Sequence, residues 1–178
     1  MLSRVADSIF WMSRYMERTK SEIKLLQTNY VALQDNAIKD NWKFIVEQYG
    51  SKDVLKNNNF KNWSYSDALI YLITDKDNPS SIINNIFYAR ENARASQDHI
   101  TKEMWQTLNN FYHFVRNDEI NHQLKYQDSM EAMDAIMQQS VLYVGMINTT
   151  MDRGVGYSFL SIGRHIEQAL QTLKILSV

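Results

Sequence analysis

Three segments of the sequence carry arginines and glutamates at spacings that could build a polar site. Residues three or four apart are neighbours on a helix, so Arg14 would share a face with Glu17 and Arg18, and Arg164 with Glu167. The full set of candidate site residues is Arg14, Glu17, Arg18, Arg90, Glu91, Arg94, Arg164 and Glu167. A planar guanidinium can hold both oxygens of a carboxylate or phosphate, so the set could form a buried anion-binding pocket.

The same side chains could instead form ion pairs that fix how the helices pack, and we favour this interpretation because charge networks are structural as often as functional. Charge complementarity predicts that Glu91 faces the first helix and pairs with Arg14 or Arg18. The two interpretations differ in one observable feature. A binding or catalytic site requires the side chains to converge on an open cavity, whereas structural pairs close on one another.

A metal site is not predicted. Glu17 and Glu167 could act as a carboxylate pair in acid–base chemistry or metal binding, but a di-metal helical bundle needs two Glu-x-x-His motifs. The sequence has one, from Glu119 to His122, which we interpret as a solvated helix end. No glycine-rich phosphate loop, nucleophile elbow or kinase motif is present. We therefore expect no bound cofactor and no direct use of ATP.

The composition predicts an all-α helical bundle that forms a single domain over residues 1–178. Hydrophobic residues make up 44% of the chain, whereas one proline and five glycines are too few for the turns of a β-sandwich. The net charge of −1 gives no attraction to nucleic acid. Asp7 interrupts any secretory signal, no apolar run approaches a membrane span, and cysteine is absent, so we expect a cytoplasmic protein.

Hydrophobic periodicity places long helices at residues 4–34 and 157–176. Shorter helices are expected at 42–49, 64–73, 80–98 and 101–115, and a helical stretch at 119–151 with a break near 126–128. Ser3 is expected to cap the first helix, and Ser64 with Asp67 to form a capping box. Asn78 is expected to cap the helix after it, with Pro79 in its first turn. Residues 57–59, all asparagine, indicate a loop.

The first and last helices share a pattern at a constant offset of 150 residues. Arg14 and Glu17 correspond to Arg164 and Glu167, and the apolar positions also correspond. The matching pairs of apolar residues are Ile9 with Phe159, Met12 with Ile162, Met16 with Ile166, Ile23 with Leu173, and Leu26 with Leu176. The pattern predicts a pseudo-repeat, in which two similar helices occupy related environments and pack on each other or on equivalent surfaces.

Three motifs in this order resemble the bacterial Alpha-E family. Residues 1–18 resemble its opening, residues 89–94 followed by 103–105 resemble its central motif, and residues 159–167 resemble its second Arg-x-x-Glu helix. The resemblance implies an all-helical protein of unestablished activity, often encoded beside ATP-grasp and transglutaminase-like proteins in neighbourhoods that make or modify peptides. It covers the N-terminal half of the family, whose members run to about twice this length.

Three functions remain open. The first is a helical accessory or interaction protein of a peptide-ligating or peptide-modifying system, with an ATP-grasp-like or transglutaminase-like protein as possible partner. The second is an enzyme that uses the arginine–glutamate cluster on a peptide or amino-acid carboxylate. The third is a self-associating structural bundle. We also expect a homodimer with an interface on the order of 2,000 Å², because aromatic residues lie on two faces of the first helix and a half-length chain leaves apolar surface uncovered.

Overall fold

The computed structural model describes residues 1–35, 42–50 and 62–176, and within these ranges the regular structure is helical, as the composition predicted. None of these helices is long and apolar enough to cross a membrane. The α-helices are α1 (Ser3–Gln34), α2 (Trp42–Tyr49), α4 (Tyr65–Ile73), α5 (Ile82–Ala95), α6 (Lys102–Val115), α7 (Asp118–Tyr126), α8 (Ser129–Thr150) and α9 (Val155–Leu176), and the 3₁₀ turn η2 covers Gln97–His99.

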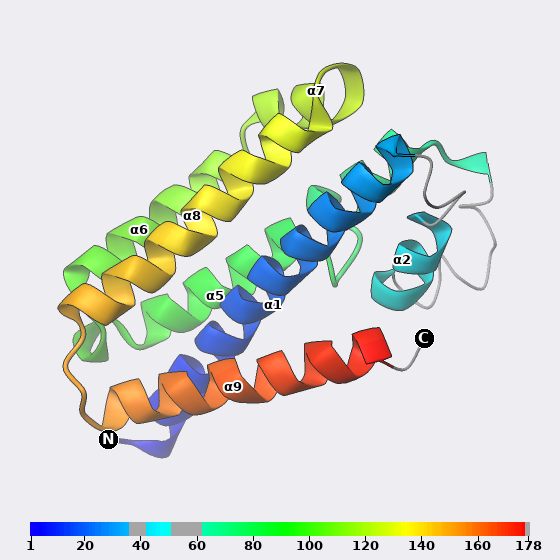
Figure 1. Ribbon diagram of the computed structural model, residues 1–178. Helices are drawn as coiled ribbons and strands as arrows, with labels where there is room; N and C mark the ends of the chain where they lie inside the picture. Colours follow the sequence, from blue (N-terminus) through cyan, green and yellow to red (C-terminus); the bar gives the residue numbers. More distant parts are fainter. Residues whose placement is uncertain (36–41, 51–61, 177–178) are drawn as a thin grey trace.

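Helix α1 is the central element of the bundle. It contacts α9 on one side and α5 and α8 on the other, while α6 packs against both α5 and α8 (Figure 1). Its apolar seam is buried as the periodicity predicted: Ile9, Met12 and Ile23 have no exposed surface. Burying side chains of this size contributes about 1.5–3 kcal/mol each, which makes this seam a main source of the bundle's stability.

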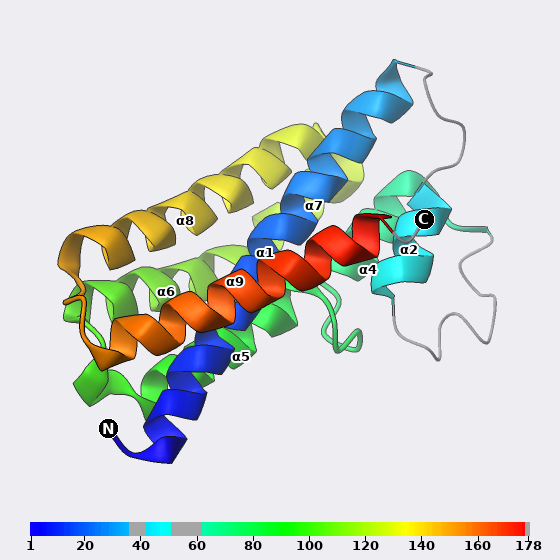
Figure 2. The same cartoon turned by 60° about the horizontal axis from the view of Figure 1, so that its bottom comes forward.

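Helices α1 and α9 cross in close contact, as predicted (Figure 2). The hydroxyl of Ser13 donates a hydrogen bond of 2.6 Å to the carbonyl of Leu160. At Gly163, a Cβ atom would lie 2.5 Å from the carbonyl oxygen of Phe10, which is closer than atoms can approach without a shift of the backbone. Glycine at position 163 therefore sets how closely the two helices pack.

Most predicted helix boundaries are confirmed. Ser64 and Asp67 form the capping box of α4, α2 ends before Gly50, and the break at 126–128 separates α7 from α8. The N-cap of α1 is Leu2 without a side-chain cap, so the prediction of Ser3 was wrong. The prediction of a loop at 57–59 lies outside the described residues.

The prediction that Asn78 caps α5 was also wrong. The cap is Ser81, whose hydroxyl accepts from the backbone N–H of Asn84 at 3.4 Å, and the helix begins at Ile82. The amide of Asn78 is buried instead, where it donates to the carbonyl of Tyr71 at 3.1 Å. A tertiary contact therefore uses the side chain that the local pattern assigned to a cap.

The structure does not confirm the pseudo-repeat. Met12, Met16 and Ile23 are buried in α1, whereas the residues 150 positions later form an outward-facing stripe on α9. Their exposed fractions are 49% for Ile162, 42% for Ile166 and 62% for Leu173. The residues that α9 buries are Leu160, Gly163, Glu167 and Gln171, of which two are polar. The shared spacing therefore marks an amphipathic stripe in both helices, but that of α9 faces away from the core.

Candidate functional site

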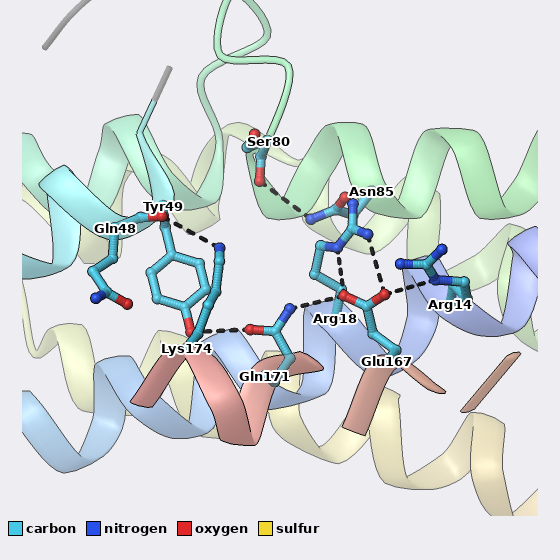
Figure 3. A network of polar contacts seen from close by, with 9 residues as sticks. All are labelled: Arg14, Arg18, Gln48, Tyr49, Ser80, Asn85, Glu167, Gln171 and Lys174. Carbon is cyan, nitrogen blue, oxygen red and sulfur yellow. Dashed lines mark hydrogen bonds and ion pairs between the residues drawn. The ribbon is translucent and has the colours of Figure 1, made fainter. Parts of the chain in front are cut away.

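A carboxylate on α9 is held between two arginines of α1 (Figure 3). Glu167 accepts from Nε of Arg14 at 2.9 Å and from Nε of Arg18 at 2.8 Å, and a further hydrogen bond of 3.2 Å comes from Nη2 of Arg18. The side chain of Glu167 is only 1% exposed. Arg14 and Arg18 are four residues apart and therefore share the face of α1 that meets α9.

The network continues along α9 to helix α2. The side-chain amide of Gln171 donates to Glu167 at 2.8 Å and accepts from the hydroxyl of Tyr49 at 3.0 Å. One turn further, the ammonium group of Lys174 donates to the carbonyl of Gln48 at 3.3 Å and stands 4.1 Å from the centre of the Tyr49 ring. Polar residues on the inner side of α9 therefore join α1 to α2 (Figure 3).

A cavity of about 280 Å³ opens beside this network. Its lining comes from α1, from α2 and the residue after it, from the turn before α5, and from α9: Arg14, Arg18, Glu22, Gln48, Tyr49, Gly50, Ser80, Glu167, Leu170, Gln171 and Lys174. We call this cavity the α1–α9 pocket. Three of the predicted side chains therefore fit both interpretations, structural ion pairs and an open pocket. Arg14 and Arg18 pair with Glu167, and all three also line the cavity.

Glu22 differs from Glu167 although both line the α1–α9 pocket. It has no exposed surface, and neither carboxylate oxygen has a hydrogen-bond partner among the described residues. Burial raises the pKa of Glu22 from 4.5 to about 8, although the charges of Lys174 and Arg18 oppose the shift. A buried carboxyl without donors is more stable with a proton, so Glu22 is predominantly neutral at pH 7.

Glu167 is held in the opposite state. Burial alone would raise its pKa, but the hydrogen bonds and charge of Arg18, with the bonds from Gln171 and Arg14, outweigh burial and lower the pKa. Burial would lower the pKa of Arg18, but the hydrogen bond and charge of Glu167 raise it. The pocket therefore contains one ionised and fully hydrogen-bonded carboxylate beside one protonated and unpartnered carboxyl.

Other residues of the predicted set lie elsewhere. Arg90, Glu91 and Arg94 form a separate cluster, in which Glu91 pairs with Arg90 at 2.8 Å and with Arg94 at 3.5 Å. The prediction that Glu91 pairs with Arg14 or Arg18 was therefore wrong. Its nearest partners are its own helix neighbours, and Arg90 also donates to Asn109 on α6.

Glu17 and Arg164 lie near a different part of the α1–α9 crossing. Glu17 accepts from the amide of Gln168 at 3.0 Å, and the buried Nε atom of Arg164 has no partner among the described residues. Glu17 and Glu167 therefore do not share a ligand site. Within the described ranges, no three metal-binding side chains lie close enough together to hold an ion, and His122 lies on the exposed surface of α7.

Sequence reasoning missed Glu22, Tyr49, Gln171 and Lys174 as pocket residues. A signal existed for Glu22, because it follows Arg14 and Arg18 at the same spacing of four and so belongs to their helix face. No local signal indicates that Tyr49 reaches α9, because this contact joins residues 122 positions apart.

Fold and site together define an all-helical protein whose first and last helices cross at an Arg–Glu network. The chain belongs to the Alpha-E family, described as a predicted alpha-helical domain with a conserved ER motif, and the match covers residues 1–178. The resemblance drawn from the sequence is thereby confirmed. The sequence contains a single Glu-Arg dipeptide, Glu17-Arg18, and Arg18 is the residue that makes two hydrogen bonds to Glu167.

Similar curated proteins carry no described activity. An uncharacterized protein of Mycobacterium bovis and one of Mycobacterium tuberculosis are each 23% identical to this chain over 203 residues. The match covers 97% of this chain but 22% of each relative, so the chain spans about a fifth of their length. No solved structure matches the chain.

Proposed function

We propose that the α1–α9 pocket binds the carboxylate of a peptide or a small molecule. The observation that carries this proposal is the charge balance of the pocket lining. Arg14 and Arg18 are positive, Glu167 is negative, and Glu22 is predominantly neutral at pH 7. An excess of positive charge in a partly enclosed cavity attracts an anion. Planar guanidinium groups match the two oxygens of a carboxylate.

Arg14 is the side chain best placed to take the carboxylate. It has five N–H donors, of which Glu167 uses the one on Nε. Its guanidinium lies 4.7 Å from the centre of the Trp11 ring, a cation–π contact that holds the group in place. A carboxylate bound at its remaining N–H groups would not have to break the pair with Glu167.

Binding explains the site better than acid–base chemistry does. Glu167 accepts four hydrogen bonds from Arg14, Arg18 and Gln171, so its lone pairs are occupied and its pKa is lowered, which makes it a poor base. We therefore propose an accessory role in a peptide-ligating or peptide-modifying system. The family resemblance supports this setting, in which an ATP-grasp-like or transglutaminase-like protein would perform the chemistry. Copurification of such a protein with the tagged chain from native cells is the corresponding test.

The test of carboxylate binding compares two pools of N-acetylated tripeptides, one with free carboxylates and one with carboxamides. Calorimetry should detect binding of the carboxylate pool, and Arg14→Gln should weaken it at least about tenfold, as expected for loss of one charge-assisted contact. Arg90→Gln is the matched control because Arg90 lies outside the pocket. Equal binding of both pools to the unmodified protein would refute the proposal without depending on any variant.

Self-association is a second proposed property, favoured by the stripe on the outer face of α9. The exposed large hydrophobic residues on this face are Val155, Ile162, Ile166, Leu170, Leu173 and Leu176, with exposed fractions from 42% to 73%. Together they expose on the order of 600 Å² of surface, most of the ~800 Å² that each partner buries in a standard interface. Apolar patches of this size are uncommon on monomers.

The occupant that best fits this stripe is a second copy of the chain. Ile162, Ile166 and Leu170 are spaced by four and four residues, so an antiparallel α9 pair centred on Ile166 would place Ile162 of each copy opposite Leu170 of the other. Ala169, three residues after this centre, is small and uncharged. A two-fold dimer of this kind covers the same patch on both copies.

Light scattering at micromolar concentration tests the dimer. We expect the unmodified protein to have twice the chain mass of 21.0 kDa, and the Ile166→Glu variant to have the mass of one chain. Val141→Glu makes the same change at a position on α8 that is 56% exposed, and it should remain dimeric. A mass of 21.0 kDa for the unmodified protein would refute self-association.

A further inference from the structure

Glu22 is the one carboxyl of the α1–α9 pocket for which the described structure provides no donor. Both of its oxygens are buried without a hydrogen-bond partner. Buried polar groups without a hydrogen-bond partner are rare in folded proteins and call for a specific explanation. Glu167, in the same pocket, has four hydrogen bonds.

The charged and titratable groups around Glu22 come from three helices. Arg18 lies on α1, Glu167 and Lys174 on α9, and Tyr49 on α2, and all of them line the pocket. Arg18 is engaged with Glu167, and Lys174 donates to the carbonyl of Gln48. These cations lower the cost of charge on Glu22 through space, but neither donates a hydrogen bond to it.

We infer that the natural ligand carries an ammonium group as well as a carboxylate, and that Glu22 receives the ammonium. This inference rests on the proposed binding of a carboxylate at Arg14. An ammonium group supplies three N–H donors and a positive charge, which is the strongest complement for a buried carboxylate. The pocket would then bind a molecule with opposite charges at its two ends.

The spacing along α1 sets the length of that molecule. Arg14 and Glu22 are eight residues apart, which corresponds to about 12 Å along the helix axis. Long side chains shorten this span but do not remove it. The carboxylate and α-ammonium of one amino acid are attached to the same carbon and are too close together. An extended peptide spans at most about 3.5 Å per residue, so a peptide of three residues with both ends free, which reaches about 10 Å, fits the separation once the side chains have shortened it.

Binding of this kind would be coupled to proton release. Glu22 retains its proton at neutral pH because its pKa is about 8. When the ammonium arrives, the carboxyl loses that proton to the solvent and forms an ion pair with the ligand. Nearly one proton should therefore leave for each ligand bound at pH 7.

The experiment adds a third pool, tripeptides with both ends free, to the two N-acetylated pools. Calorimetry at pH 7 in two phosphate-free buffers that differ in ionisation enthalpy reports both the affinity and the number of protons released. We expect the free tripeptides to bind about tenfold or more tightly than the N-acetylated acids, with release of nearly one proton. Glu22→Gln should abolish this preference and the proton release. Glu17→Gln, on the same helix but outside the pocket, should preserve both.

The outcomes separate this inference from the proposal on which it rests. If free and N-acetylated tripeptide acids bind equally, or if the free tripeptides bind without releasing a proton, Glu22 does not receive an ammonium, although carboxylate binding stands. If N-acetylated acids and amides bind equally, carboxylate binding itself is refuted. If none of the three pools binds at millimolar concentration, both ideas are refuted.

Discussion

Glu22 should make the folded protein less stable as the pH rises, which is opposite to the usual effect of a carboxyl group. Replacing Glu22 with glutamine should remove this dependence. The pKa of Glu22 is about 8 in the folded protein and has an ordinary value of 4.5. The folded state therefore binds more protons than the unfolded state between these values, so its stability falls as the pH rises. Glutamine has no such proton, and Glu22→Gln should lose this dependence.

The magnitude follows from the size of the shift. Each pH unit changes the free energy of unfolding by about 1.4 kcal/mol while the folded state keeps the proton and the unfolded state has lost it. From pH 4.5 to pH 8 the stability contributed by protonated Glu22 should therefore decline by on the order of 5 kcal/mol. The amide of glutamine adds donors to the buried site at a cost of about 1–3 kcal/mol, but this cost does not vary with pH.

Urea unfolding at a series of pH values measures the effect. We subtract the unfolding free energy of the unmodified protein from that of the Glu22→Gln variant at each pH. This difference should rise from pH 5 to pH 8. The contributions of ionisable groups other than Glu22 are nearly the same in both proteins and cancel. Glu167→Gln is the control of opposite sign. The pKa of Glu167 is lowered, so the stability that its charge contributes is lost only as the pH falls below its ordinary value of 4.5. A flat difference for Glu22→Gln between pH 5 and pH 8 would show that Glu22 is not a buried neutral acid.

Three further substitutions test the packing and the ion pairs. Glu167→Gln removes the charge that two partly buried arginines contact and should cost about 3–5 kcal/mol at pH 7 in urea unfolding; a cost below about 1 kcal/mol would show that the pairs contribute little. Gly163→Ala forces the backbone near Phe10 to move and should cost about 1–3 kcal/mol, whereas Gly145→Ala, which meets open space on α8, should stabilise by about 0.5–1 kcal/mol. If both glycine variants have the same stability, the close approach of α1 and α9 is not a constraint. Glu91→Ala should cost less than about 1 kcal/mol because Glu91 is 37% exposed, and a larger loss would indicate a structural role for its pairs.

Much of the fold could be predicted because local patterns decide it. The seam repeats along most of the 32-residue helix α1, and the capping box at Ser64 involves only the chain around it. The prediction failed at Asn78 because a contact with Tyr71, seven residues away, competes with the local cap. Periodicity also could not show which side of α9 faces the core, since a stripe of apolar residues has the same spacing whether it is buried or exposed.

The site was predictable in part for the same reason. Arg14, Arg18 and Glu167 stand out as charged residues at helical spacing, but the pairing of arginines with carboxylates depends on how the helices cross. Glu91 found partners on its own helix, at separations of one and three residues. The sequence does not indicate that Glu22 is buried without a hydrogen-bond partner, because its burial depends on how α2 and α9 pack around that position.

Helix α9 inverts the usual arrangement of an amphipathic helix, and this inversion links the pocket to the proposed dimer. Its inner side can be polar because Glu167 and Gln171 find hydrogen-bond partners on α1 and α2, so their burial leaves no unpaired charge. Its outer side, by contrast, exposes Ile162 and Ile166 to water, which is unfavourable for apolar side chains. An apolar outer face is therefore best explained by a surface that covers it, whereas a polar inner face is best explained by the pocket that it lines.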